Sequence, residues 1–198
     1  MIATLDRVRA ALGDHVPRTV QGSASLRHAA VAAVLRPAEA GAELLFIHRA
    51  EDDRDPWSGH MAFPGGRVES DDSDPLATAI RETQEELALN LASHAKLIGR
   101  LSEVDAIGRG RRAGMVILPY VFALEQACEL RPNHEVQQVV WVPLSFLLDN
   151  RNRSSLTWTR LGVPIPLPCY RYQGHVIWGL TLVMVDELRQ LLEDHPNR

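Results

Sequence analysis

Apolar and polar positions alternate along this chain in short runs, which predicts a series of strands broken by a few helices. Strands are expected at residues 28–35, 43–47, 96–104, 116–124 and 136–142, with a late hairpin of residues 167–172 and 175–178. Helical spacing predicts helices at residues 1–13, 74–89, 144–148 and 180–192. Because strands and helices do not alternate in a regular βαβ rhythm, we expect an α/β fold with a mixed β-sheet between helical layers.

Nothing in the sequence divides the chain into separate units. It has no internal repeat and no linker between regions of different composition, so a single domain over residues 1–198 is predicted, with residues 1–25 as an N-terminal helical extension. Asp74-Pro75 marks the start of a helix, in which Asp is the N-cap residue and Pro occupies the first helical position. Asn90 is the expected terminator of that helix.

Composition and charge narrow the partners that can be expected. The chain is 45% hydrophobic and 23% charged with a formal net charge of −4, an ordinary globular balance that favours neither nucleic acid nor an anionic membrane. No segment is long and apolar enough for a signal peptide or membrane span, so a cytoplasmic location with reduced Cys128 and Cys169 is expected. The oligomeric state is left open, with a homodimer as one option.

Candidate chemistry is concentrated in residues 63–89. Glu82, Glu85 and Glu86 are spaced i, i+3 and i+4, so their carboxylates project from one helix face, where they repel one another. Carboxylate oxygens are preferred Mg²⁺ ligands, and the preceding Gly65-Gly66 allows the backbone to approach an ion closely. A solvated surface helix is the competing interpretation, and the glycine pair favours the metal site.

This stretch resembles the Nudix box, G-x5-E-x7-R-E-U-x-E-E-x-G-U, where U is a bulky apolar residue. Arg81, Glu82, Glu85 and Glu86 match its R-E…E-E, and Leu89 matches the final U. The loop carries one extra residue, so the early Glu position falls on Asp72 or Ser73 depending on the direction of counting. Thr83 stands at the first U and Ala88 at the later Gly.

Sequences outside the box are similar to the coenzyme A diphosphatase branch of the Nudix family. Gly59 with residues 63–66 resembles G-x3-F-P-G-G, and residues 177–181 resemble I-W-G-x-T. Leu44-Leu45 and Arg49 lie near the positions of that branch's L-L-T-x-R-S, although Ile47 and Ala50 depart from it.

The resemblance implies a Nudix-like α/β/α sandwich and a hydrolase in which Mg²⁺ or Mn²⁺ assists attack of water on a diphosphate. It implies a metal site made of Glu82, Glu85, Glu86 and the Gly65 carbonyl, with Glu82, Glu85 and Arg81 as catalytic residues. Arg49 and Gly66 are expected to contact the substrate, a small-molecule nucleoside diphosphate derivative.

A further carboxylate outside the box often completes a Nudix site, and Glu135 is its candidate here. Glu135 precedes a predicted strand that ends in W-x-P-L; Glu103, Asp105 and Glu125 are the alternatives, and a plain surface carboxylate is the competing interpretation.

Less specific features complete the set of candidates. Arg111 and Arg112 could bind substrate phosphate or simply be solvated in a loop. Trp57 could stack on a base or pack on its own domain, whereas Trp141, Trp158 and Trp178 are expected in the core.

Three functions compete at this point. The leading one is hydrolysis of coenzyme A or acyl-coenzyme A to 3′,5′-ADP and (acyl)phosphopantetheine. The second is hydrolysis of a nucleotide sugar or ADP-ribose, which the departures at Ile47 and Ala50 keep open. The third is a non-catalytic nucleotide-binding module, against which the intact glutamate cluster argues.

Overall fold

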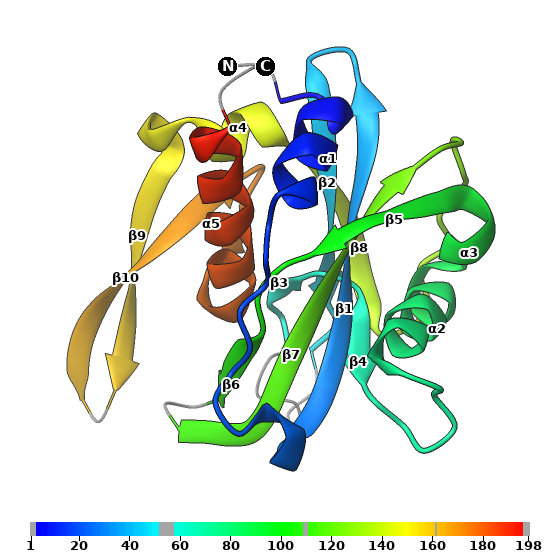
Figure 1. The fold of residues 1–198 in the computed structure, drawn as a ribbon. Helices are drawn as coiled ribbons and strands as arrows, with labels where there is room; N and C mark the ends of the chain where they lie inside the picture. Colours follow the sequence, from blue (N-terminus) through cyan, green and yellow to red (C-terminus); the bar gives the residue numbers. More distant parts are fainter. Residues whose placement is uncertain (1–2, 52–57, 109–110, 161, 196–198) are drawn as a thin grey trace.

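The protein is described by a computed structural model that covers residues 3–51, 58–108, 111–160 and 162–195, with backbone alone at 107–108, 111–113 and 160. Most of its elements belong to one large sheet and the helices packed on it (Figure 1). In chain order the elements are α1 (Leu5–Gly13), a 3-10 turn (Ser23–Ser25), β1 (Arg27–Ala38), β2 (Gly41–Arg49), β3 (Met61–Ala62), β4 (Gly65–Arg67), α2 (Pro75–Leu87), α3 (Leu91–His94), β5 (Ala95–Arg100), β6 (Val104–Gly108), β7 (Arg111–Leu124), β8 (Val136–Pro143), α4 (Leu144–Leu148), a second 3-10 turn (Asn150–Asn152), β9 (Arg153–Arg160), β10 (Val163–Tyr172), β11 (His175–Ile177) and α5 (Gly179–Asp194).

The large sheet is mixed, as the sequence predicted. Its path runs β3-β2-β1-β7-β5, while β4 pairs with β1, β6 with β7 and β8 with β2. The central β1 and β7 run parallel, with Ala29 opposite Ile117, and the other pairs are antiparallel. A mixed sheet of this kind must be covered on both faces to bury its apolar side chains.

The sequence of β1 explains why both faces are covered. Ala29, Ala33 and Leu35 belong to one buried cluster, together with residues of α1, α4 and α5. Ala30, Ala32 and Val34 belong to a second cluster, which includes Ala79 and Leu87 of α2. Because successive strand residues point to opposite faces, this apolar run supplies both cores at once. The α/β/α layering is therefore confirmed.

The N-terminal helix is part of one helical layer. In Figure 1, α1 lies beside α5, and the two described chain ends lie near each other. The buried Arg7 of α1 donates hydrogen bonds to the carbonyls of Leu192 and His195 at the end of α5. A cation at a helix C-terminus satisfies unpaired carbonyls and stabilises the helix dipole.

The single strand expected at residues 96–104 is wrong, because β5 and β6 are separate strands that both pair with β7. Between them, the backbone N–H of Ser102 donates to the carboxylate of Glu187 on α5 at 2.9 Å. The N–H of Glu103 donates to the carbonyl of Arg18 at 2.9 Å. These long-range partners take the place of ladder hydrogen bonds, and sequence periodicity carries no sign of them.

The end of α2 also differs from the prediction. The helix stops at Leu87, and Ala88 adopts a left-handed conformation with φ 56°, in the position where the Nudix box has Gly. Asn90 is the N-cap of α3, where its side chain accepts a hydrogen bond from the Ser93 N–H. The expected terminator thus begins the next helix.

A second sheet of β9, β10 and β11 was only partly anticipated. Its β9–β10 ribbon extends away from the body of the molecule (Figure 1), and β9 was not predicted at all. Pro164, Pro166 and Pro168 alternate along β10, a composition that normally argues against a strand. β10 pairs with β9 on one edge from Val163 to Tyr170, and with β11 on its other edge only at residues 170–172. Over the proline-rich part this second edge has no partner strand, so it needs no N–H donors.

The tryptophan prediction holds only in part, since Trp141, Trp158 and Trp178 are all partly exposed, and of the three it is Trp141 that packs against a buried core cluster. Arg36 stacks over the Trp141 ring at 4.1 Å, and Trp158 lies on the β9–β10 ribbon. Trp178 forms part of a cavity wall.

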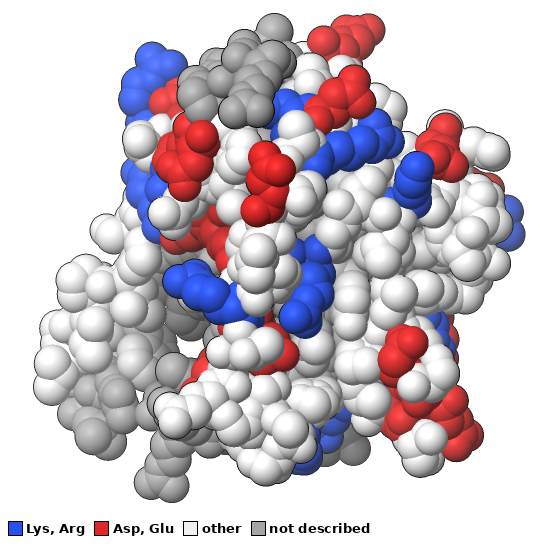
Figure 2. All heavy atoms as spheres, viewed as in Figure 1, with Lys and Arg blue, Asp and Glu red and all other residues white. Residues whose placement is uncertain are grey.

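No helix of the described segments is long and apolar enough to cross a membrane. On the face shown in Figure 2, basic and acidic side chains are interspersed, with acidic ones gathered over the loop between β4 and α2. This face presents no continuous basic surface within the described residues.

Candidate active site

The loop that leads into α2 is held by one charged pair. Asp72 accepts two hydrogen bonds from Arg81, with Nε to Oδ1 and Nη2 to Oδ2 both at 3.0 Å. These hydrogen bonds hold the pKa of the Asp72 carboxyl well below its usual range. Of the two residues left open by the loop length, Asp72 is therefore the one that pairs with Arg81, and the extra residue is absorbed after it.

Glu86 is the most deeply placed carboxylate of α2. Its side chain is 3% exposed, Oε2 accepts the Gly65 N–H at 2.9 Å, and Oε1 lies 3.7 Å from Nη1 of Arg49. Burial raises the pKa of Glu86 to about 8, although the Gly65 N–H and Arg49 act in the opposite direction. A buried carboxyl group with so little compensation is a position where a cation would be strongly favoured.

Glu82 lies against the glycine pair. A Cβ atom on Gly66 would be only 2.2 Å from Oε1 of Glu82, so the missing side chain at Gly66 makes room for this carboxylate. Gly65 has φ 149°, and a Cβ there would lie 2.3 Å from the Ala30 carbonyl oxygen. Burial raises the pKa of Glu82, while Arg81 lowers it and the charges of Glu85 and Glu135 raise it further.

Arg81 connects the first two glutamates of the box. Its Nη1 donates to Oε1 of Glu82 at 3.0 Å and lies 3.3 Å from Oε2 of Glu85, whose side chain is 54% exposed. Among the described residues, no three His, Cys, Asp or Glu side chains are already gathered as a metal site. The donor set nevertheless suits a hard divalent cation, because Glu82 and Glu86 are carboxylates that repel each other beside a close backbone turn.

Glu135 is brought to this cluster by the loop before β8. The N–H groups of Arg131 and Asn133 donate to the carbonyls of Leu87 and Glu86 at 2.8 and 2.9 Å, which fastens the loop to the end of α2. The Glu135 N–H donates to Oδ1 of Asn133 at 2.8 Å. The Glu135 charge makes a small contribution that raises the pKa of both Glu82 and Glu86.

Two of the alternatives to Glu135, Glu103 and Glu125, have other surroundings. The Glu103 carboxylate accepts the Val20 N–H at 2.8 Å and so holds the N-terminal segment. Glu125 is exposed beyond the end of β7. Asp105 lies on β6, opposite Val116 of β7.

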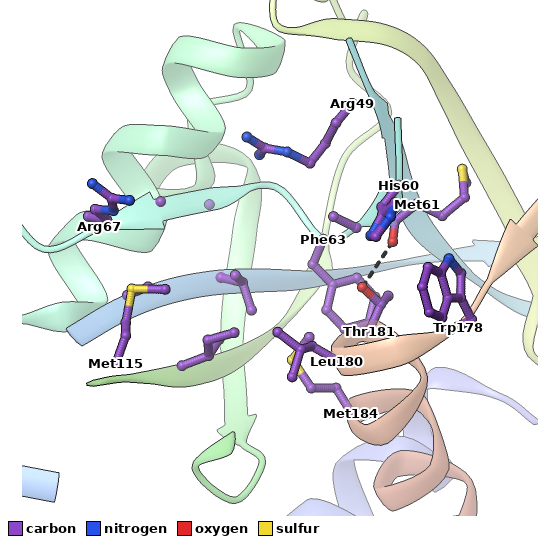
Figure 3. Close-up of a pocket in the computed structure, with 16 residues that line it drawn as sticks. Arg49, His60, Met61, Phe63, Arg67, Met115, Trp178, Leu180, Thr181 and Met184 are labelled. Atoms are coloured by element: carbon purple, nitrogen blue, oxygen red, sulfur yellow. Dashed lines mark hydrogen bonds between the residues drawn. The ribbon is translucent and has the colours of Figure 1, made fainter. Parts of the chain in front are cut away.

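Beside the glycine pair is a cavity of about 280 Å³ (Figure 3). Arg49 and Arg67 lie at its Gly65–Gly66 side, and Trp178 packs on His60 with ring centroids 4.8 Å apart. Most of the remaining wall is apolar and comes from β1, β7, α5 and the segment between β3 and β4, with Val31, Phe63, Met115, Ile117, Leu180 and Met184 among its members. An apolar cavity with a few charged groups at one side is typical of a small-molecule site.

Sequence reasoning missed Arg67, His60 and Trp178 as cavity residues. The I-W-G-x-T resemblance contained Trp178, and Arg67 directly follows the glycine pair, so both had a local signal. Arg111 and Arg112 begin β7, but their side chains lie outside the described residues, as does Trp57. Their substrate contacts stay predictions.

Comparison with known proteins decides the family. The NUDIX domain model matches residues 26–159, which include β1, the glycine pair, α2 and β8. The chain belongs to the Nudix family. It is a Nudix hydrolase, and hydrolases of this family act on small nucleotide derivatives.

Several Nudix relatives are about one third identical to the chain over the segments that match. The uncharacterized Nudix hydrolase NudL of Photorhabdus laumondii is 33% identical over 69% of this chain and 70% of its own length. The mitochondrial coenzyme A diphosphatase NUDT8 is 35% identical in mouse and 34% in human, over 68% and 75% of this chain. These matches span 63% and 62% of the mouse and human proteins, just under two thirds.

Solved structures confirm the fold. The MutT protein of Methanosarcina mazei Go1 superposes with a TM-score of 0.54 at 15% identity, over 93% of this chain and 100% of that one. The Nudix hydrolase RenU of M. smegmatis gives a TM-score of 0.52 at 18% identity, over 86% and 89%. At these identities the likeness concerns the fold alone.

Proposed function

We propose that this Nudix hydrolase cleaves the diphosphate of coenzyme A or acyl-coenzyme A by attack of water at phosphorus. The observation that carries the proposal is the pair of carboxylates Glu86 and Glu82, which lie against Gly65 and Gly66 at one side of an apolar cavity. The similarity to the NUDT8 coenzyme A diphosphatases supports the choice of substrate.

A divalent cation, Mg²⁺ or Mn²⁺, would be held by Glu82, Glu85 and Glu86 with the Gly65 carbonyl. When bound, it neutralises non-bridging phosphate oxygens and lowers the pKa of water. The raised pKa values of Glu82 and Glu86 support this assignment, because a cation removes the cost of ionising carboxyl groups that burial and mutual repulsion impose.

The remaining residues orient the reactants and manage the proton. Arg81 holds the loop through Asp72 and fixes the positions of Glu82 and Glu85. Arg49 and Gly66 border the cavity, where a guanidinium and a close backbone approach can receive a diphosphate. Glu135 is half exposed, with a side-chain exposure of 53%, so its carboxylate can accept the proton of an attacking water that arrives from solvent.

The test is hydrolysis of coenzyme A by the purified protein with Mg²⁺ or Mn²⁺. The products are separated by chromatography and identified by mass spectrometry. Formation of 3′,5′-ADP and phosphopantetheine is expected, with loss of activity in EDTA. Glu85→Gln should lose most activity while the fold persists, because Glu85 is largely exposed. Full activity of that variant at limiting Mg²⁺ would contradict the metal assignment.

A further inference from the structure

Packing against α4 and α5 holds the base of the β9–β10 ribbon. There Arg153 of β9 pairs with Asp186 of α5, and Tyr170 of β10 donates its hydroxyl to the Leu147 carbonyl of α4 at 2.7 Å. Over residues 163–169, β10 pairs with β9 and not yet with β11, and this part extends away from the body of the molecule (Figure 1). A two-stranded hairpin by itself is only marginally stable in water. The projecting part of the ribbon would therefore be stabilised by a further strand.

The projecting ribbon has one polar and one apolar face. Residues directly opposite each other in a strand pair have side chains on the same face, and successive residues alternate between faces. Arg153 is opposite Tyr170, so the face that contacts α4 and α5 continues along β9 with Ser155 and Thr157. The other face carries four partly exposed apolar side chains in two cross-strand pairs, Leu156 with Leu167 and Trp158 with Ile165.

The two outer edges of the ribbon differ in the hydrogen bonds they can make. Every second residue of β10 from Pro164 to Pro168 is proline, and across the ribbon these prolines are opposite Ser155, Thr157 and Thr159. Because proline has no N–H to donate, such pairs are of the kind in which the backbone groups of both residues turn away from each other. The outer edge of β10 thus lacks donors, whereas the outer edge of β9 presents an N–H and a C=O at each of the three opposite positions.

The outer edge of β9 is open to another strand. Within the described part of the chain, β9 pairs with β10 alone. It contains no proline, and residues 154–159 carry no charged side chain, so two common protections of an edge strand are missing. An unprotected edge of this kind is a template for pairing with another strand.

The strand that fits this edge best is a second copy of β9. When two copies run antiparallel about a twofold axis at Thr157, each Leu156 is opposite Trp158 of the partner subunit. These large apolar side chains then meet on the apolar face, where such cross-strand pairs are favourable. On the edge itself, the two Thr157 residues exchange a pair of N–H···O=C hydrogen bonds.

We propose that the chain forms a homodimer in which the outer edges of two β9 strands pair antiparallel about Thr157. The two ribbons become one sheet, and the contact is closed because the same edge is used on both subunits. β9 and β10 have eight and ten residues, fewer than the roughly 20–30 residues per side of a standard interface. The dimer should therefore be weak, with a Kd on the order of micromolar. It would form whichever diphosphate the chain hydrolyses.

A pair of cysteine substitutions tests the register of this dimer in the full chain. Under mild oxidation Thr157→Cys should give a covalent dimer, because the Cα atoms of a hydrogen-bonded pair are about 5.5 Å apart, within the range of a disulfide. Ser155→Cys is the control, since it is exposed on the same edge and face. In the proposed dimer its two copies are four residues apart along the edge, about 14 Å, and should stay unlinked. The wild type, with free Cys128 and Cys169, should also stay unlinked.

Sedimentation velocity from about 0.1 to 100 μM measures the association without a cross-link. The wild type should shift from monomer to dimer over this range. Thr157→Pro should stay monomeric with an unchanged circular dichroism spectrum, because it removes an outward N–H and no β9–β10 hydrogen bond. Thr157→Val keeps that N–H and should dimerise like the wild type. A wild type that is monomeric at every concentration, or equal cross-linking by Thr157→Cys and Ser155→Cys, would overturn the proposed dimer.

Discussion

Replacing Glu86 with Gln should make the protein more stable above neutral pH when divalent cations are removed with EDTA. Gln has the shape of Glu, and its amide oxygen can still accept the Gly65 N–H that Oε2 of Glu86 accepts at 2.9 Å. The substitution therefore removes the charge and keeps the main contact. A buried carboxylate is costly unless it is paired, so the neutral side chain should be the better occupant of this position in apo protein.

The magnitude follows from the raised pKa. Below pH 4.5 the Glu86 carboxyl is protonated in both the folded and unfolded chain and has no effect on the pH dependence. Between pH 4.5 and about 8 the folded state binds more protons than the unfolded state, so stability falls as the pH rises. Once the group is ionised in both states, the accumulated loss is on the order of 5 kcal/mol.

Urea unfolding in EDTA, measured from pH 5 to 9, tests this directly. The wild-type free energy of unfolding should fall relative to that of Glu86→Gln across this range, and Glu125→Gln, at an exposed position, should follow the wild type. Mg²⁺ should then restore stability to the wild type and not to Glu86→Gln, because a ligand stabilises only the state that binds it. Parallel pH profiles for wild type and Glu86→Gln would refute the claim that Glu86 is a buried carboxyl group with a raised pKa.

Three further substitutions have defined outcomes. Asp72→Asn should lower the free energy of unfolding by about 2 kcal/mol at neutral pH, because Arg81 loses its charged partner. The difference in free energy of unfolding from wild type, measured by urea unfolding, should shrink below pH 3.8, where Asp72 of the unfolded chain takes up a proton. Gly66→Ala should lower kcat by about 10²-fold or more, because its Cβ would displace the box glutamate beside it; steady-state kinetics with a circular dichroism check would test this. Glu135→Gln should lower kcat at least about tenfold with little change in KM, whereas Glu125→Gln should be silent in the same assay.

Local sequence predicted the elements whose partners are close in the chain. The start of α2 could be predicted because Asp74 caps the helix and Pro75 follows it. The shared face of the box glutamates could be predicted because their spacing is helical. The role of Glu135 stays a prediction; its position before a strand could be inferred from the sequence, whereas the loop that fastens it to α2 could not.

Features that depend on distant contacts escaped sequence analysis. The gap between β5 and β6 comes from hydrogen bonds to Arg18 and Glu187, which lie more than 80 residues away in the chain. The cavity is assembled from Val31, Met115 and Met184, each on a different element, so no local pattern marks it. Pairing with β9 allows the proline-rich β10 to form a strand, against its composition.

The most direct test of the account is a competition among coenzyme A, ADP-ribose and UDP-glucose at equal concentrations below their KM values, with Mn²⁺. The ratio of products then equals the ratio of kcat/KM values. The account predicts that 3′,5′-ADP and phosphopantetheine dominate by about tenfold or more over products of the other two. Preferential hydrolysis of ADP-ribose or UDP-glucose would contradict it, although the chain would remain a Nudix hydrolase.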